Sequence, residues 1–332
     1  MKLILIGEEN SKRTDFFKKA AENFHVPVEV IGWDVLQQEG FSLRNLQQAA
    51  VKIDPPSFQT IRLSHMQSLL EIYKKALQKL TQADCHFLNS PEAIWRLLDK
   101  KGTKGHLHKM HIPVTQMFED EIGDSEQLLG QMHSRHCYSV FVKPRYFSGA
   151  AGVAAFRAHP FRGDMVLYTS CRIENGDLVN TKKLFKMTNR DEIVTFLNRL
   201  LALDCVIERW HPKAGYKGKS YDLRVVFQFG HIAHIVVRQS NGPITNLHLN
   251  NQALEVKELG LDSRCIQGIE EVCFQAVSSF SGLHMAGVDI LLEKETMRPM
   301  VIEMNGQGDL IYQDIYDKNN IYREQVEKLC RI

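Results

Sequence analysis

The chain has 332 residues, a length that predicts two or three subdomains rather than one small domain. Its formal net charge of +2 is too balanced to predict nucleic-acid or membrane binding, and 44% hydrophobic residues are typical of a globular protein in water. No apolar segment has the length of a membrane span. The seven cysteines are scattered without a C-x-x-C pair, so we expect reduced thiols and a cytoplasmic protein.

The first part of the chain alternates strand and helix patterns. "KLILIG" is typical of a buried strand, a helical pattern covers about Ser11 to Phe24, and "VPVEVIGW" is a second strand. This order predicts a small α/β unit with a parallel pair of strands. "DPPS", residues 54–57, indicates a turn, and a helical pattern then runs from Phe58 to about Leu80.

The stretch "LNSPEAIWRLLDKKG" predicts the start of another helix. Ser90 is suited to the N-cap, and Pro91 is suited to the first helical position because its missing N–H would be unpaired there anyway. We expect this helix to end or break near Gly102 or Gly105, where glycine weakens a helix.

After about Arg135 most of the sequence has strand patterns. Examples are "YSVFVKP", "GVAAF", "DMVLYTS" and "DCVIERW", and "FQFGHIAHI" predicts a hairpin with a short turn. Helical stretches are expected at residues 190–201 and 262–280 and from about Asn319 to the end. The fold class is therefore α+β, with a largely antiparallel C-terminal part.

Two apolar strands near the C-terminus carry acidic residues. If the polar stretch between "AGVDILLEK" and "MVIEMN" forms a turn centred near Thr296, Asp289 lies opposite Glu303. Period-two alternation then places Asn305 on the same face as Glu303. Two carboxylates and an amide oxygen are the ligands that Mg²⁺ prefers. The alternative is an exposed sheet face with ordinary salt bridges.

Two other segments contain basic or glycine-rich patterns. "VFVKPRYFSGAAGV" ends a strand with Lys143 and continues into a loop with Ser148, Gly149 and Gly152, where backbone N–H groups could approach phosphate oxygens. A plain hairpin with a flexible glycine turn is the alternative. The hairpin strands "DLRVVFQF" and "IAHIVVRQ" place Arg224 and Arg238 where they could clamp a phosphoryl group, or form surface ion pairs.

Taken in order, these motifs resemble those of the ATP-grasp superfamily, and most closely its branch of ribosomal-protein glutamate ligases and glutathione synthetases. The motifs are the lysine after "NSPEAI", the strand lysine with its glycine loop, "ERW", "DLR", "TNLH", "AGVD" and "E-x-N". The resemblance covers roughly Phe87 to the C-terminus. It implies an N-terminal α/β domain at residues 1–86 and an ATP-grasp domain at 87–332, with a lid at about 106–208 and a metal-binding subdomain at about 209–332.

The resemblance also implies roles for individual residues. Lys100 and Lys143 would contact ATP from two subdomains, and the loop from Ser148 to Gly152 would close over the phosphates. Arg224 and Arg238 would hold the γ-phosphate or an acyl-phosphate. The cofactors would be ATP and one or two Mg²⁺ ions, with Mn²⁺ as an alternative. The metal ligands would be Asp289, Glu303 and Asn305. Arg209 and Trp210 would meet adenine through backbone atoms, and Asp222 would lie near the ribose. The other ATP-site residues would be Glu208, Gly149, Gly152 and Asn246.

The implied activity is ATP-dependent ligation of a carboxylate to an amine through an acyl-phosphate, with small-molecule, amino-acid or peptide substrates. A small-molecule kinase of the inositol-phosphate kinase type and a non-catalytic ATP-binding protein are the alternatives. The sequence departs from the family pattern at Ile244 and Thr245, where Arg-Ser often precedes the Asn that is Asn246 here, and at "GQGDL", where Pro-Gly often follows "E-x-N". Both departures indicate a difference at the substrate side. The sequence does not indicate an oligomeric state.

Overall fold

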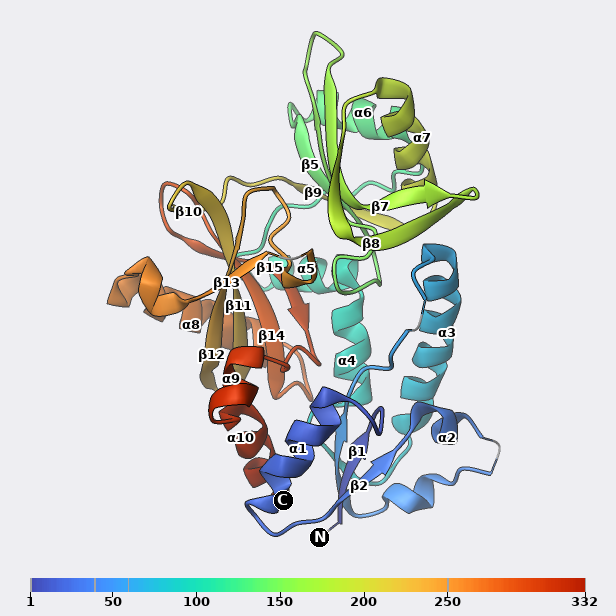
Figure 1. Ribbon diagram of the computed structural model, residues 1–332, viewed down its shortest axis with the longest axis vertical. Helices are drawn as coiled ribbons and strands as arrows, with labels where there is room; N and C mark the ends of the chain where they lie inside the picture. The colour runs from blue at the N-terminus through green and yellow to red at the C-terminus, as the bar shows by residue number, and fades with distance from the viewer. Residues whose placement is uncertain (1, 39, 59, 250, 332) are drawn as a thin grey trace.

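A computed structural model describes residues 2–38, 40–58, 60–249 and 251–331 of the chain. Within these ranges the strands form three sheets, and each sheet is built from one continuous stretch of sequence. The sheets occupy three lobes, and both ends of the chain lie in the lobe of the N-terminal sheet (Figure 1). The predicted mixture of helices with a largely antiparallel C-terminal part is confirmed.

The N-terminal sheet is parallel, with strand order β2-β1-β3-β4. The predicted parallel pair is confirmed by the register of Leu3 with Val28. The third strand was not predicted, because Lys52 interrupts its short apolar run, yet all of its residues are buried. The elements of this part are β1 (Lys2–Ile6), α1 (Lys12–Glu22), β2 (Val28–Ile31), α2 (Trp33–Gln37), the 3₁₀ helix η1 (Leu43–Leu46), β3 (Ala49–Ile53), α3 (Leu63–Leu80) and β4 (His86–Phe87).

Two short helices, α4 (Pro91–Leu98) and α5 (Lys100–Lys109), connect the first sheet to the rest of the chain. The predicted helix start is confirmed, since the Ser90 hydroxyl accepts a hydrogen bond from the Ala93 N–H at 3.1 Å. The predicted break near Gly102 or Gly105 is wrong. The break falls at Asp99, whose carboxylate accepts from the Gly102 N–H at 2.9 Å and so starts the second helix.

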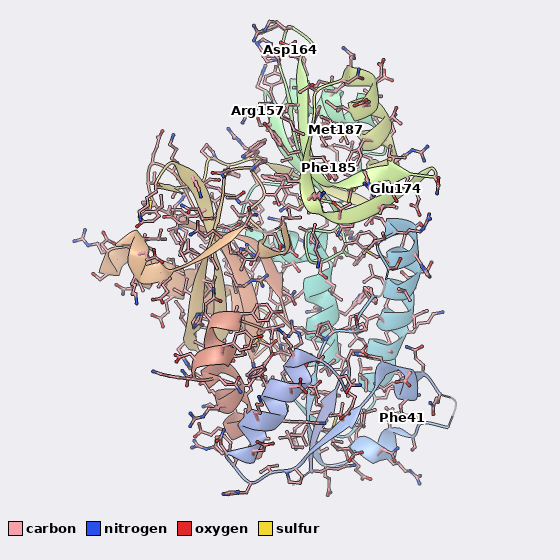
Figure 2. All side chains as sticks on the ribbon, viewed as in Figure 1. Phe41, Arg157, Asp164, Glu174, Phe185 and Met187 are labelled. Atoms are coloured by element: carbon pink, nitrogen blue, oxygen red, sulfur yellow. The ribbon has the colours of Figure 1, made fainter. Side chains whose placement is uncertain are left out.

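The second sheet is antiparallel, with order β8-β7-β6-β5-β9. The long polar strand β8 was not predicted, because its lysines hide the period-two pattern. The hairpin between β6 and β7 projects away from the other lobes, with Asp164 at its end (Figure 2). The elements are α6 (Ser125–Ser134), β5 (Ser139–Pro144), β6 (Ala154–Ala158), β7 (Met165–Glu174), β8 (Asp177–Met187), α7 (Arg190–Leu201) and β9 (Cys205–Arg209).

The third sheet has the order β13-β12-β11-β14-β15, with β10 beside β11. The predicted hairpin is confirmed, and its turn uses Phe229 and Gly230 with positive φ values of 50° and 92°. The elements are β10 (Gly215–Tyr216), β11 (Lys219–Gln228), β12 (His231–Ser240), the 3₁₀ helix η2 (Leu247–Leu249), β13 (Gln252–Glu255), the 3₁₀ helix η3 (Val256–Leu259), α8 (Ser263–Ser278), β14 (Met285–Leu292), β15 (Pro299–Asn305), α9 (Tyr312–Asp317) and α10 (Asn320–Cys330).

Apolar packing connects the three sheets to one another. Tyr322 and Val326 of α10 share a core with Leu3 and Phe17 of the N-terminal sheet and its helix, and Leu70 of α3 belongs to the core of the second sheet. These contacts fix the space that lies between the sheets. Within the described ranges, no helix combines the length and apolar character needed to cross a bilayer.

Candidate functional site

The two acid-bearing strands pair as predicted. In the hairpin of β14 and β15, Asp289 lies opposite Glu303 and Gly287 lies opposite Asn305. The register then shifts, so that Ile290 lies opposite Val301, which is a β-bulge next to the acids. The predicted convergence of the three oxygen-bearing side chains on one patch of sheet therefore holds in the backbone register.

Both predicted arginines contact one of these acids. The Asp289 carboxylate lies 3.0 Å from Arg224 Nε and 3.0 Å from Arg238 Nη2. The contact with Arg224 follows from the sheet, because β11 places this residue directly beside Asp289. The arginines and the acid form one cluster, in which the side chains of Arg238 and Asp289 are 6% and 13% exposed.

The donor set of this face suits a hard divalent cation. Glu303 is the more accessible acid, with 28% of its side chain exposed, and Asn305 Oδ1 already accepts the Gln307 N–H at 2.9 Å. Within the described residues, no three His, Cys, Asp or Glu side chains gather as a metal site, so the face offers two carboxylates and one amide oxygen. This composition fits Mg²⁺, which takes one or two carboxylates and completes its shell with water and phosphate oxygens.

The two predicted lysines come from different elements and line the same cavity, which has a volume of about 90 Å³. Lys100, at the start of α5, donates a short hydrogen bond to the Phe147 carbonyl and lies 3.5 Å from Glu303 Oε1. Lys143, near the end of β5, donates to Glu208 Oε2 at 2.9 Å. Both lysines are only 7% exposed, and both line the cavity.

Glu208 is the centre of a buried network that sequence reasoning found only in part. Its Oε2 lies 3.3 Å from Lys104 Nζ and accepts the Thr115 hydroxyl at 3.2 Å. Burial alone would raise the pKa of Glu208, but the two lysine ammonium groups lower it below its ordinary value. Burial lowers the pKa of Lys104 to about 8, against the carboxylate of Glu208, which raises it. The missed signal was the spacing of Lys104 four residues after Lys100, which places both on one helix face.

Asp222 forms a second network at the same cavity. Its Oδ1 accepts Arg238 Nε at 2.7 Å, and its Oδ2 lies 3.2 Å from Lys213 Nζ and accepts a short hydrogen bond from the Thr245 hydroxyl. Burial opposes ionisation of Asp222, but Arg238 and then Lys213 hold its pKa well below the ordinary value. Lys213 was missed by sequence reasoning, because a lysine in a loop carries no periodic signal.

The predicted glycine loop contributes Ala150 and Ala151 to the walls of two cavities. Gly149 and Ala150 have positive φ values of 66° and 64°. Gly152 has a φ of 73°, and a Cβ at this position would lie 2.6 Å from Pro144 Cγ. The two glycines therefore differ in role, since Gly152 permits close packing against β5, whereas Ser148 and Gly149 line a cavity.

Not all of the remaining predicted ATP-site residues line the cavity. Arg209 and Asn246 line the cavity, whereas the Trp210 ring packs on Phe141 at 5.4 Å between ring centroids. The Arg209 N–H donates to the Gln116 carbonyl at 2.9 Å and the Trp210 N–H donates to the Ser139 carbonyl at 3.0 Å. A backbone contact from these two residues to adenine would therefore have to use their carbonyl oxygens.

Two cavities meet at the acid-bearing face. The smaller, of about 90 Å³, is lined by the lysines and by Glu208 and Asp222. The larger, of about 750 Å³, extends toward the N-terminal sheet and includes Arg13, Tyr73 and Gln307. The residues that line both cavities are Phe147, Ala150, Ala151, Arg238, Asn246, Asp289 and Glu303. The two cavities therefore share one wall, which includes both acids of the sheet face.

Several solved structures share the fold of this chain, although their sequences are only 12% to 14% identical to it. No protein-family model matches the chain, and no curated protein sequence does. The D-cycloserine synthetase DcsG is 14% identical, with a TM-score of 0.64 over 99% of this chain and 100% of that one. The macrocyclase MdnC of Microcystis aeruginosa MRC, bound with precursor peptide MdnA, is 12% identical, with a TM-score of 0.63 over all of both chains.

A third similar structure is the ATP-grasp ligase PsnB complexed with minimal precursor, Mg and ADP. It is 13% identical, with a TM-score of 0.58 over 99% of this chain and 97% of that one. These likenesses extend over nearly the whole of each chain, including the N-terminal parallel sheet. The chain has the ATP-grasp fold, as its motifs predicted.

Proposed function

We propose that this chain is an ATP- and Mg²⁺-dependent carboxylate–amine ligase that forms an amide or peptide-type bond through an acyl-phosphate. The observation that carries the proposal is the meeting of the two cavities at Asp289 and Glu303. A phosphoryl group can pass from one ligand to another only where both reach the same face, because such transfer depends on positioning and charge neutralisation. The smaller cavity would take ATP, with its triphosphate end at the shared face, and the larger would take the acceptor.

The residues of this chain would divide the work by position. Lys100 and Lys143 would neutralise phosphate oxygens from α5 and β5. Arg224 and Arg238, already aimed at Asp289, would hold the γ-phosphoryl group. Glu303, Asn305 and Asp289 would hold Mg²⁺, which when bound neutralises charge on the triphosphate. The loop from Ser148 to Gly152 would keep water away from the reacting groups.

The chemistry proceeds in two balanced steps. A substrate carboxylate oxygen attacks the γ-phosphorus, the bond from that phosphorus to the β–γ bridging oxygen breaks, and ADP leaves. The amine nitrogen then attacks the carbonyl carbon of the acyl-phosphate, the carbon–oxygen bond breaks, inorganic phosphate leaves, and the nitrogen loses a proton. Neither step needs a nucleophilic side chain from the protein.

The kinase alternative is less well supported by the larger cavity. Its described lining contains three arginines, of which Arg224 and Arg238 are paired with Asp289, and many apolar side chains. A polyphosphate acceptor would need a denser set of cations. The similar structures include a synthetase, a macrocyclase and a ligase, two of them in complex with precursor peptide or minimal precursor. We also propose that the protein belongs to the branch of glutamate ligases and glutathione synthetases, and that it is cytoplasmic. The cytoplasmic location is consistent with its seven cysteines, all of which are free thiols.

The test is ADP release by the purified protein with Mg²⁺ and a matrix of carboxylates and amines. Ligase activity is expected to require both substrates and to give an amide detected by mass spectrometry. Hydroxylamine added in place of the amine should trap the acyl-phosphate as a hydroxamate. A stable phosphorylated acceptor formed without an amine would instead support a kinase, and tight ATP binding with no ADP from any pair would support a non-catalytic protein.

A further inference from the structure

We propose that Arg13 binds a second, non-reacting carboxylate of an otherwise apolar substrate in the larger cavity. This inference rests on the proposed function, because it concerns what that cavity accepts. Arg13 is the second residue of α1, where a positive charge is unfavourable beside the helix N-terminus. Local helix chemistry therefore gives no reason for an arginine at this place, and the reason has to come from tertiary contacts.

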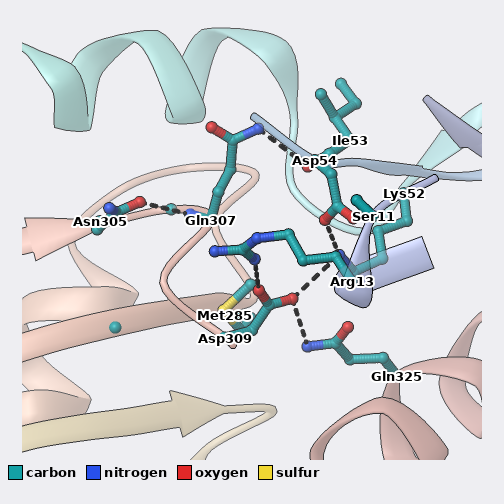
Figure 3. Close-up of polar contacts among 12 residues, drawn as sticks. Ser11, Arg13, Lys52, Ile53, Asp54, Met285, Asn305, Gln307, Asp309 and Gln325 are labelled. Carbon is teal, nitrogen blue, oxygen red and sulfur yellow. Dashed lines mark hydrogen bonds and ion pairs between the residues drawn. The ribbon is translucent and has the colours of Figure 1, made fainter. Parts of the chain in front are cut away.

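One side of the Arg13 guanidinium is fixed by a buried acid. Its Nη1 forms a short ion pair with Asp309, whose side chain is 0% exposed. Lys52 Nζ lies 3.0 Å from the other Asp309 oxygen, which also accepts Gln325 Nε2 at 3.4 Å (Figure 3). Burial opposes ionisation of Asp309, but Lys52 and then Arg13 lower its pKa, so the acid is charged. This network fixes the position of the guanidinium.

The other side of the guanidinium faces the cavity. Figure 3 shows it extending toward Gln307 and Asn305, and 20% of the Arg13 side chain remains exposed. A guanidinium carries five N–H donors in a planar fork, so Asp309 does not exhaust it. An arginine that is held in place and still partly exposed is well suited to a carboxylate, with which it can form two parallel hydrogen bonds.

Apolar side chains line one part of the larger cavity. Its lining from the N-terminal part of the chain includes Phe58, Met66, Leu70 and Leu98. Arg224 and Arg238, the other arginines of the lining, are paired with Asp289 at the reacting end. Arg13 is therefore placed for a carboxylate that does not react. An amino acid with an apolar side chain, as the amine substrate, and an apolar dicarboxylic acid both have this chemistry.

The "GQGDL" segment ties this arrangement to the metal face. The Gln307 side chain accepts a hydrogen bond from the Tyr73 hydroxyl at 2.9 Å and donates one to the Ile53 carbonyl at 3.0 Å. The Gln307 backbone N–H donates to Asn305 Oδ1. Asp309, two residues later, holds Arg13. The segment where the sequence departs from the family pattern thus joins a proposed metal ligand to the proposed carboxylate anchor.

Calorimetry with Mg²⁺ and a non-hydrolysable ATP analogue present measures the binding of candidate substrates and so tests this role of Arg13. The probes are leucine, phenylalanine and octanedioate, each compared with its carboxamide, in which one carboxylate is replaced. The wild type is expected to bind at least one acid about tenfold more tightly than its amide, the range of a charge-assisted hydrogen bond. Arg13→Gln should remove that preference without changing the affinity for the nucleotide analogue.

Two further variants keep the result interpretable. Lys12→Gln removes the same charge from the adjacent helix position, where the lysine binds Tyr316 on the surface, and should keep the preference. Arg13→Gln/Asp309→Asn removes the buried carboxylate together with the Arg13 charge and leaves Lys52 paired with Asp54, so it should fold even if Arg13→Gln does not, and it should lack the preference.

Equal affinity for acid and amide in the wild type, or no binding of any acid, would overturn the role of Arg13. So would a preference that persists in the double variant. Because binding does not require turnover, this failure is distinct from failure of the ligase proposal, which shows as the absence of ADP from every carboxylate–amine pair.

Discussion

The two cavities that meet at Asp289 and Glu303 have different walls. The smaller has buried charges in compact networks, in which Lys143, Glu208, Asp222 and Arg238 are each at most 7% exposed. The larger combines apolar side chains from α3 and its neighbours with Arg13 of α1. The proposed nucleotide side thus relies on charges fixed by the sheets, whereas the proposed acceptor side depends on how the N-terminal part packs against them. Four changes test this division.

The largest effect is expected at the face that both cavities share. Glu303→Gln keeps the shape of the side chain but removes the more accessible carboxylate of the proposed metal face. We expect kcat for ADP release to fall by about 100-fold or more, because charge neutralisation at the transferring phosphoryl group is lost. The melting temperature should stay close to that of the wild type.

The matched control is Glu293→Gln, at the turn of the same hairpin, where the carboxylate contacts the Thr296 hydroxyl at 2.5 Å. It should leave kcat unchanged. Full activity in Glu303→Gln, or an equal loss in both variants, would show that the shared face is not the reacting face.

Next in size is the buried charge network of the smaller cavity. Lys143→Met leaves Glu208 with Lys104 as its remaining ammonium partner, in a site where both side chains are at most 4% exposed. We expect a loss of about 3 kcal/mol in the free energy of unfolding, since the buried carboxylate loses a charge-assisted hydrogen bond. Urea denaturation measures it. Glu208→Gln, which leaves the Lys104 and Lys143 ammonium groups without this carboxylate, should cost more, and an equal or smaller cost would mean that the pairing is not the source of the stability.

A smaller effect is expected where the N-terminal part contacts Gln307, in the segment that follows β15. Gln307→Leu removes two side-chain hydrogen bonds and leaves the Tyr73 hydroxyl and the Ile53 carbonyl without this partner. The expected loss of unfolding free energy is about 2 kcal/mol. KM for the acceptor should rise while KM for ATP stays the same. Gln313→Leu, an exposed position on the rim of the larger cavity, is the control, and a rise in KM for ATP alone would contradict the division.

The smallest effect concerns pH. Because the pKa of Lys104 is lowered to about 8, its positive charge is present below that pH and is lost above it. The affinity for ADP should therefore fall by roughly threefold to tenfold as the pH rises from about 7 to about 9, since one cation beside Glu208 and Lys143 disappears. Fluorescence titration of ADP at each pH measures this change.

The control for the pH effect is Lys104→Met, which should bind ADP more weakly at about pH 7 and show a flatter profile. Stability has the opposite dependence. The unfolded chain holds more protons than the folded one between pH 8 and the ordinary lysine value of 10.5, so stability should rise with pH through that window. An unchanged profile in the variant would assign the pH dependence to another group.

Much of the proposed nucleotide side could be predicted from the sequence, because its signals are local. The pairing of Asp289 with Glu303 followed from a turn near Thr296 and from strand alternation, and the hairpin has that register. Lys143 was found because it ends an apolar strand. Lys104 was missed although it lies four residues after Lys100, and Lys213 was missed because only the folded network around Asp222 distinguishes it from a surface lysine.

By itself the sequence determined most of the strands, the helix start at Ser90 and the faces on which the acids and arginines lie, because turn chemistry and side-chain periodicity act over a few residues. Only the tertiary structure decided where Arg13 points and what Asp309 does. These two residues are separated by 296 positions in the chain, and their contact exists because α1, β3 and α10 pack together around a buried acid. Such a contact leaves no periodic trace in either segment, so the acceptor side had to be found in the fold.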